Sequence, residues 1–158
     1  MSEIHYQHFD SPIGTLRLLA RDGALVRIEF ENGLRDDGIE QDDPVLAETA
    51  HQLQQYFAGE RTDFDLPLRA EGTDFQRQVW NALSDIPFGE LRSYRDIATS
   101  IGRDKAVRAV GAANGANPIP IVVPCHRVVG SDGTLTGFGG GLPAKKRLLA
   151  IEGITLTR

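Results

Sequence analysis

The hydrophobic pattern of this chain changes its period part of the way along, and that change constrains the fold more than any other feature. Early in the chain, Val26, Ile28 and Phe30 alternate with charged residues, which is the period of a half-buried β-strand. Later, apolar residues such as Val79 and Leu83 recur four apart, which is the period of an amphipathic helix. Strand-forming segments followed by helix-forming segments indicate an α+β fold.

The early part of the chain predicts a small sheet followed by one helix. Asp22 and Gly23 both tolerate a positive φ, so they favour a tight hairpin between two strands. Asp43 and Pro44 are typical of a helix start, and Gly59 is typical of a helix end. The predicted strands cover residues 4–9, 16–20 and 25–30.

Residues 60–72 show no helical or strand period and are interpreted as a linker, which divides the chain into domains 1–72 and 73–158. The second domain predicts short helices that begin at capping-box pairs and end at glycines. The predicted features are capping pairs Thr73–Gln76 and Ser93–Asp96, a helix over about 105–115 capped by Asp104, and a last helix over about 143–152. Two of these helices flank Gly102 in a helix-turn-helix pattern, which many proteins without a DNA partner also show.

The composition excludes several classes of protein. With 41% hydrophobic and 25% charged residues, the chain is typical of a globular protein. No apolar run approaches the roughly 20 residues of a membrane helix, and the first residues lack the pattern of a signal peptide. A single Cys cannot form an internal disulfide, so we expect a cytoplasmic protein with no membrane partner.

The formal net charge of −5 argues against a nucleic-acid partner, but the charge is unevenly distributed. Residues 1–72 carry 6 Arg and no Lys against 15 acids, a net charge of −9. Residues 73–158 carry 11 Lys and Arg against 7 acids, a net charge of +4, and residues 92–108 have a local charge of +3. This asymmetry is a hint of a surface that faces a polyanion, although a solvated basic surface gives the same pattern.

The predicted helix over 105–115 has an unusually smooth surface. Ala109, Gly111 and Ala112 are among its small residues, although each Gly in a helix costs about 1 kcal/mol of propensity. Small side chains let a backbone approach another surface closely, whether that surface is a neighbouring helix or a groove. The long cation Arg108 interrupts the smooth surface.

The most informative segment surrounds the single cysteine. Three prolines and an apolar run lead into Cys125 and His126. A lone Cys is more often a small buried hydrophobic residue than a nucleophile. A reactive Cys needs a nearby base or a positive field, which His126, Arg127 or a helix N-terminus could supply.

The most specific motif of the chain is Pro124-Cys125-His126-Arg127-Val128. Further distinctive blocks are 75–80, 86–90, 93–94, 108–111, 117–118, 140–142 and 148–153. In these motifs and their order, across most of residues 73–158, the sequence resembles the O6-alkylguanine-DNA alkyltransferases, also called methylated-DNA–protein-cysteine methyltransferases. Residues 1–72 match only in layout. The resemblance implies a small RNase H-like N-terminal domain and a mostly helical, winged helix-turn-helix-like C-terminal domain.

The resemblance also implies an activity. Such proteins move an alkyl group from O6-alkylguanine, and from O4-alkylthymine, in DNA to their own Cys, irreversibly and once per molecule. It implies that Cys125 is the acceptor, His126 is the base acting through a water, and Glu152 orients the imidazole. Tyr94 is expected to assist the leaving group, and Asn117 is expected to brace the turn around Cys125. No cofactor is expected.

The partner implied by the resemblance is double-stranded DNA, bound through its minor groove, with the damaged nucleotide flipped out and Arg108 inserted in its place. The expected DNA contacts besides Arg108 are Ser93, Arg92, Arg95, Arg103, Lys105, Ala109, Gly111 and Ala112. The expected base pocket consists of Tyr94, Val128, Phe138, Gly139 and Gly140. A monomer in solution is expected, and clustering on DNA stays open.

Two pocket positions depart from the family pattern, in which Tyr is frequent at the position of Phe138 and Ser at that of Gly139. The departures remove two hydroxyls and create a run of three glycines, so we predict a loose pocket that accepts alkyl groups larger than methyl. Some relatives carry zinc in the first domain. Here only the scattered His5, His8 and His51 are present, so no metal site is expected.

Two other functions remain open from the sequence. One is a DNA-binding sensor without chemistry, which the retained acceptor cysteine disfavours. The other is a thiol hydrolase that uses Cys125 and His126. A hydrolase would turn over repeatedly, whereas an alkyl acceptor would react once.

Overall fold

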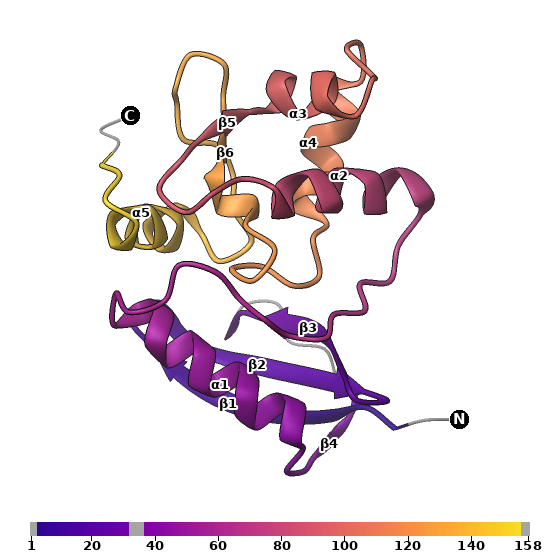
Figure 1. Ribbon diagram of the computed structural model, residues 1–158, viewed down its shortest axis with the longest axis vertical. Coiled ribbons are helices and arrows are strands. Elements are labelled where there is room, and N and C mark those ends of the chain that lie inside the picture. Colours follow the sequence, from indigo (N-terminus) through magenta and orange to yellow (C-terminus); the bar gives the residue numbers. More distant parts are fainter. Residues whose placement is uncertain (1–2, 32–36, 156–158) are drawn as a thin grey trace. The chain divides into compact units, whose positions relative to one another are not determined.

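The computed structural model describes residues 3–31 and 37–155 (Figure 1). The chain divides into two compact units, Met1–Glu71 and Gly72–Arg158. The first unit contains a sheet and one long helix, and the second contains mostly short helices. The predicted α+β class is therefore confirmed.

The sheet of the first unit is built on three antiparallel strands, β1 (His5–Ser11), β2 (Gly14–Arg21) and β3 (Ala24–Glu29). The short β4 (Ile39–Glu40) pairs in parallel with β1, which gives the order β3-β2-β1-β4. Asp22 and Gly23 join β2 to β3 with φ of 52° and 76°, as the hairpin signal predicts. β4 was not predicted, because two residues are too few to show a period.

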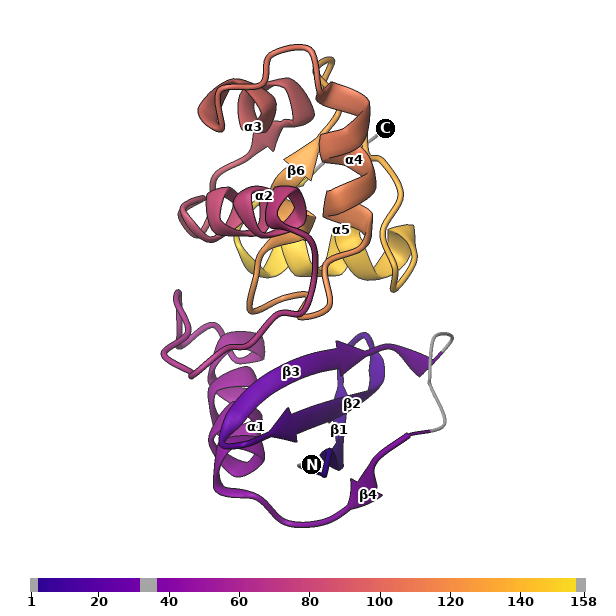
Figure 2. The same cartoon turned by 90° about the vertical axis from the view of Figure 1, so that its right-hand side faces the viewer.

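Helix α1 (Pro44–Phe57) packs against β1, β2 and β3, as Figure 2 shows. It begins where its cap predicts, with Asp43 Oδ1 accepting a hydrogen bond from the N–H of Val45 at 3.1 Å. It ends at Phe57, and Gly59 stops it from continuing, with φ of 77° and its N–H donating to the carbonyl of Tyr56 at 3.0 Å. Tyr56 is fully buried and anchors this end of the helix.

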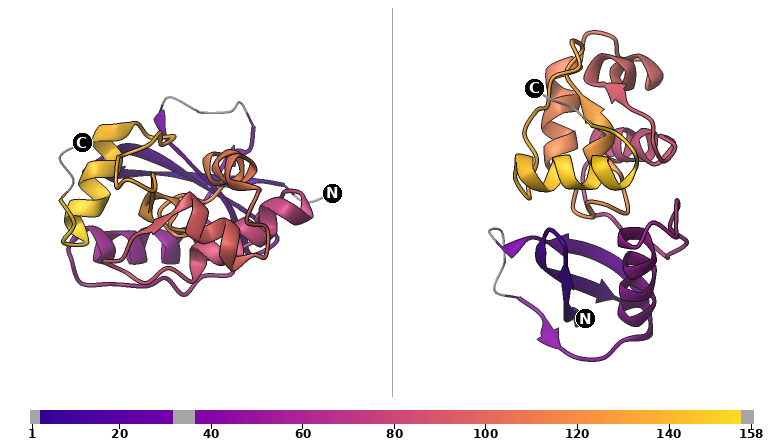
Figure 3. Two further views of the ribbon diagram at one scale, coloured as in Figure 1. Left: turned by 90° about the horizontal axis from the view of Figure 1, so that it is seen from above. Right: turned by 90° about the vertical axis from the view of Figure 1, so that its left-hand side faces the viewer.

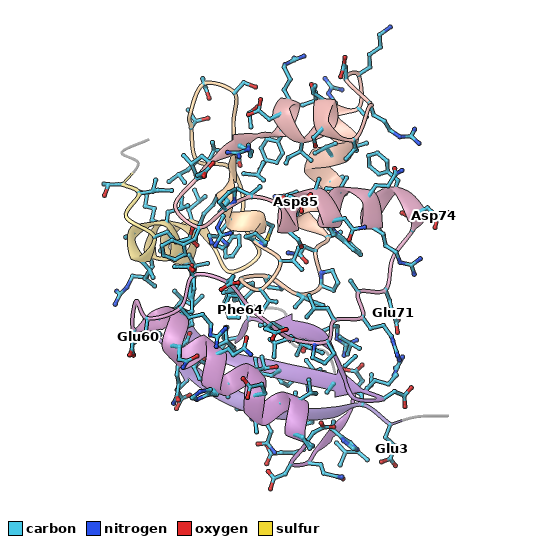
Figure 4. All side chains as sticks on the ribbon, in the orientation of Figure 1. Glu3, Glu60, Phe64, Glu71, Asp74 and Asp85 are labelled. Carbon is cyan, nitrogen blue, oxygen red and sulfur yellow. The ribbon has the colours of Figure 1, made fainter. Side chains whose placement is uncertain are left out.

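Residues 60–71 contain no helix and no named strand, but hydrogen bonds fix the segment to the first unit. The N–H of Leu25 donates to the carbonyl of Pro67 at 2.8 Å, and the N–H of Arg69 donates to the carbonyl of Leu25 at 2.9 Å. The ring of Phe64, labelled in Figure 4, lies 5.5 Å from that of Tyr56. The segment lacks a hydrophobic period because backbone hydrogen bonds, rather than one apolar face, hold it in place.

The second unit combines short helices with a two-stranded parallel sheet (Figure 3). Its elements are α2 (Asp74–Ser84), β5 (Arg92–Ser93), α3 (Tyr94–Ser100), α4 (Val107–Gly115), β6 (Val128–Val129) and α5 (Leu142–Ile151). Helices α2, α3 and α4 pack on one another, and Trp80 Nε1 donates to the carbonyl of Ala113 at 2.8 Å. In Figure 4, Asp74 and Asp85 mark the two ends of α2.

The helix ends of the second unit follow the predictions in most places. Both capping boxes are present, at Thr73–Gln76 and Ser93–Asp96. Gly102 ends α3 with φ of 74°, and Gly153 ends α5 with φ of 84°. Within the described ranges, no helix is long and apolar enough to cross a membrane.

The predicted start of α4 is wrong. The helix begins at Val107 rather than near 105, and its N-cap, Ala106, makes no side-chain hydrogen bond. Asp104 is therefore not a cap. A turn closed by the N–H of Ala106, which donates to the carbonyl of Arg103 at 2.8 Å, delays the helix by about two residues.

Candidate functional site

Cys125 is the first residue of a short 3-10 helix, η2 (Cys125–Arg127), which leads into β6. The residue is buried, with 5% of its surface exposed. Its N–H donates to the carbonyl of Val123 at 2.8 Å, and its own carbonyl accepts from Asn114 Nδ2 at 3.4 Å. Backbone contacts on both sides therefore fix the position of the thiol.

The turn that precedes Cys125 is closed by the N–H of Val123, which donates to the carbonyl of Ile119 at 2.9 Å. Asn117 holds both ends of it, because its Nδ2 donates to the carbonyl of Val123 at 2.8 Å and its Oδ1 accepts from the N–H of Ile119 at 3.0 Å. Between them, the fully buried Ile121 has φ of 74°, a conformation that β-branched residues rarely adopt. The turn is a strained segment that the surrounding packing maintains.

Glu152 gathers two side chains of the cysteine segment at the end of α5. His126 Nε2 lies 2.6 Å from Glu152 Oε2, and Arg127 donates from Nε to Oε1 at 2.8 Å and from Nη2 to Oε2 at 3.1 Å. The N–H of Gly89 donates to Oε1 at 3.0 Å. The structure thus brings His126 and Glu152 together, and it directs Arg127 to this carboxylate, although the sequence offered Arg127 as a cation for the thiol.

Burial and pairing shift the pKa values of this cluster. Burial alone would raise the pKa of Glu152, but hydrogen bonds from His126 and Arg127 bring it down to about 2. Burial lowers the pKa of His126, against the opposing effect of Glu152. A neutral imidazole whose Nε2–H donates to Glu152 keeps its lone pair on Nδ1, so His126 is suited to accept a proton.

Burial raises the pKa of the Cys125 thiol, while a hydrogen bond from Asn117 and the charge of Lys145 lower it. The cation that favours the thiolate is therefore Lys145, which the sequence analysis missed. Lys145 lies on α5 with 0% of its surface exposed. Leu148 and Leu149 follow it at helical spacing, so its place on the apolar face of this helix was the available signal.

Tyr94, the first residue of α3, is connected to the loop between β6 and α5. Its hydroxyl hydrogen-bonds to Thr136 Oγ1, and Thr136 also accepts hydrogen bonds from Lys145. Burial raises the pKa of Tyr94, and the nearby Cys125 adds to this increase, so the phenol keeps its proton at neutral pH. The family resemblance implies that Thr136 begins the loop beside the base pocket, but its hydrogen bond to Tyr94 was not predicted.

The remaining predicted pocket residues belong to two structures. Val128 is fully buried in β6, directly after η2. Phe138, Gly139 and Gly140 lie in the loop before α5, where the N–H of Gly141 donates to the carbonyl of Phe138 at 2.9 Å. Residues 137–140 contain no helix or strand.

The smooth surface predicted for α4 faces outward in part. Arg108, Ala109 and Ala112 are exposed, whereas Val110 is fully buried, and Gly111 is half-buried. One side of the helix therefore packs on its neighbours while the other presents small side chains and one long cation.

The predicted phosphate contacts differ in their surroundings. Arg95, Arg103 and Lys105 are exposed, and the guanidinium of Arg103 lies 5.7 Å from the centre of the Phe75 ring. Arg92 forms an ion pair with Glu90 at 3.0 Å. Ser93 is half-buried and caps α3. Of these residues, Arg92 is held by a carboxylate of its own chain.

Two of the three histidines of the first unit are partnered by carboxylates, and the three are not grouped as metal ligands. His5 Nδ1 lies 3.0 Å from Asp43, and His8 Nδ1 lies 3.3 Å from Glu40. His51 is exposed on α1. Among residues 3–31 and 37–155, no three His, Cys, Asp or Glu side chains are grouped to hold a metal ion.

Comparison with known families finds two matching domain models. The DNA binding domain of 6-O-methylguanine DNA methyltransferase matches residues 74–154, and its ribonuclease-like domain matches residues 4–70. Together the two models cover nearly all of the chain.

Named relatives match over nearly their whole length. The methylated-DNA–protein-cysteine methyltransferase of Mycolicibacterium paratuberculosis is 51% identical, over 94% of this chain and 92% of its own. That of Methanosarcina acetivorans is 47% identical, over 95% of this chain and 99% of its own. The crystal structure of Mycobacterium tuberculosis OGT in complex with DNA superposes with a TM-score of 0.88 at 50% identity, over 94% of this chain and 92% of that chain.

Proposed function

Because the chain belongs to the 6-O-methylguanine DNA methyltransferase family, we propose that it repairs DNA by transferring an alkyl group from O6 of guanine, and from O4 of thymine, to Cys125. The observation that carries the proposal is the buried Cys125, which is followed in the sequence by a base held by a carboxylate, His126 with Glu152, and whose thiolate is favoured by the buried cation Lys145. Each of these groups favours formation or use of a thiolate.

The transfer is a displacement at the alkyl carbon. A bond forms between Cys125 Sγ and this carbon as the bond between the carbon and O6 breaks. The electron pair of the broken bond stays on guanine, which takes up one proton, and the thiol proton passes to His126 through a water. The products are unmodified guanine and a thioether, which water does not hydrolyse, so each molecule reacts once.

Glu152 supports His126 as the orienting group. Its low pKa keeps it ionised, so it holds the imidazole by the 2.6 Å contact and stabilises the imidazolium once the thiol proton has moved. Asn117 supports the acceptor by holding the turn around it. Tyr94 is protonated before the reaction, because its pKa is raised. Its hydroxyl can therefore donate a proton or a hydrogen bond to O6 of the departing base.

DNA recognition is assigned to α4 and its surroundings. The reacting carbon lies on the edge of a stacked base, so the nucleotide must leave the stack at a cost of about a few kcal/mol. The exposed Ala109 and Ala112 allow close approach to the minor groove, and Arg108 is long enough to fill the vacated space. We infer that the protein binds as a monomer, and that Arg95, Arg103 and Lys105 contact phosphates.

Intact-protein mass spectrometry tests the proposed function. The protein is mixed with a duplex that contains O6-methylguanine, and we expect a gain of one methyl group per molecule, absent in Cys125→Ala and with an undamaged duplex. Binding without mass gain would favour a damage sensor. Repeated cleavage of an acyl substrate with no mass gain would favour a thiol hydrolase.

A further inference from the structure

Lys145 is a buried ammonium whose hydrogen bonds are directed at the candidate site. Its Nζ donates to the carbonyl of Val128 at 2.7 Å, to the carbonyl of Thr136 at 3.3 Å and to Thr136 Oγ1 at 3.3 Å. An ammonium has three N–H donors, and these three acceptors satisfy them. A buried charge is stable only when it is hydrogen-bonded in this way, so the lysine and the loop around Thr136 hold each other in place.

Thr136 connects this cation to Tyr94. The Thr136 hydroxyl has two lone pairs and one proton. Either hydroxyl can donate in the hydrogen bond between Thr136 Oγ1 and Tyr94, but an oxygen that accepts from the ammonium of Lys145 is a weaker acceptor and carries a more acidic proton, which favours donation from Thr136 to the phenol oxygen. In that arrangement the phenol proton is directed to a third partner. The positive charge of Lys145 strengthens each donor in this series of hydrogen bonds.

We propose that Lys145 and Thr136 are positioning residues for alkyl transfer, which orient the Tyr94 hydroxyl as a donor toward the departing O6. The proposal rests on the proposed function. It assigns a task to Thr136, whose side chain makes no contact with Cys125 among the hydrogen bonds of the described residues. It also makes the loop between β6 and α5 part of the chemistry, since Lys145 ties that loop to Val128.

The protonation states agree with this arrangement. Burial lowers the pKa of Lys145 to about 8, against the opposing effect of Cys125, so the ammonium form still predominates at pH 7. Burial raises the pKa of Tyr94, so its proton stays on the phenol. The Lys145 ammonium and the Tyr94 hydroxyl therefore both carry their protons at neutral pH.

A double-mutant cycle between Thr136 and Tyr94 tests the proposal, with single-turnover methyl transfer from a duplex as the measurement. We expect Thr136→Val to slow transfer about tenfold and Thr136→Ser to restore it, because serine keeps the hydroxyl. In the Tyr94→Phe background, Thr136→Val should have no further effect. Additive losses, or failure of serine to restore transfer, would overturn the inference.

Lys145→Met provides an independent arm, with Lys146→Met, an exposed neighbour on the same helix, as the matched control. We expect Lys145→Met to slow transfer at least about tenfold and to abolish the effect of Thr136→Val, while the control stays within about twofold. Wild-type-like transfer in Lys145→Met would overturn the inference. If Lys145→Met does not fold, the Thr136 cycle still decides.

The two proposals fail in different ways. If the wild-type protein gains no methyl group, the proposed function is wrong. If the wild-type protein gains a methyl group but the cycle is additive, only the role of Lys145 and Thr136 is wrong.

Discussion

At the scale of single residues, the site is organised by buried polar groups that satisfy one another. Glu152 receives hydrogen bonds from His126, Arg127 and the backbone of Gly89, and its side chain has no exposed surface. Removing the charge of such a group leaves its buried partners without an anion, which costs about 3–5 kcal/mol. Glu152 therefore stabilises the fold as well as orienting the imidazole.

Glu152→Gln is expected to destabilise the protein in a pH-dependent way. The ordinary pKa of the carboxyl is 4.5, and the folded state holds it at about 2. The stabilisation from Glu152 is therefore complete above pH 4.5 and is lost as the pH falls toward 2. Urea unfolding at pH 7 should show a loss of about 3 kcal/mol in the variant, and the difference from wild type should shrink near pH 3. An equal difference at both pH values would contradict this account.

The pocket residues give a second prediction at this scale. Phe138 and Gly139 lack the hydroxyls that are frequent in the family, so we expect benzyl transfer to be comparable in rate to methyl transfer. In the double variant Phe138→Tyr with Gly139→Ser, we expect the benzyl rate to fall by about tenfold relative to the methyl rate, since a more hydrogen-bonded loop is less adaptable. Rates from free O6-methylguanine and O6-benzylguanine measure the ratio. A strong methyl preference in the wild type would refute the loose pocket.

Much of the site could be predicted because the motif around Cys125 is specific. His126 and Glu152 were expected together, and they are hydrogen-bonded. Lys145 was missed because lysine in a sequence usually indicates a solvated surface, and its position on the apolar face of α5 with Leu148 and Leu149 was not given weight. Roles in the reaction, unlike positions, stay predictions.

At the scale of elements, α4 shows how one helix serves two surfaces. Val110 and Ala113 are buried, while Ala109 and Ala112 face outward. The expected end signals located most helices, since the capping boxes of α2 and α3 are encoded by neighbouring residues. The prediction that Asp104 caps α4 was wrong, because the residues after Gly102 form a turn and the helix begins only at Val107.

Ala112→Leu tests the outward face of α4. Leucine has nearly the helix propensity of alanine, so the stability should change by less than about 0.5 kcal/mol. The added bulk should weaken binding to duplex DNA by about tenfold or more and leave transfer from free O6-methylguanine unchanged. The matched control is Ala150→Leu, which alters an exposed alanine of α5. Fluorescence anisotropy measures the binding, and equal losses in both variants would argue against α4 as the DNA surface.

At the scale of the whole molecule, the charge is divided between the two parts of the chain. Residues 1–72 carry −9 and residues 73–158 carry +4, so the total of −5 hides a basic part. A protein that must inspect DNA of any sequence needs sequence-independent contacts to phosphates, and these depend on salt. Both the charge and the hydrophobic period of the sequence change near residue 72, and the two compact units divide between Glu71 and Gly72.

The salt dependence of binding counts these contacts. If Arg95, Arg103 and Lys105 each neutralise one phosphate, log Kd should rise with log[salt] with a slope of about 2.7. Lys105→Gln should reduce the slope by about 0.9. Arg92→Gln serves as the comparison and should change it less, because Glu90 already neutralises Arg92. Equal changes from both variants would contradict the assignment.

The strained turn before Cys125 limits the evolutionary routes open to this position. Glycine at position 121 would relax the backbone, where φ is 74°, but would empty a buried volume. Asparagine tolerates that φ better, but it would bury an amide among apolar neighbours. Each of these two substitutions therefore exchanges one defect for another. The turn is expected to keep a buried apolar residue at position 121 while the chain around it diverges.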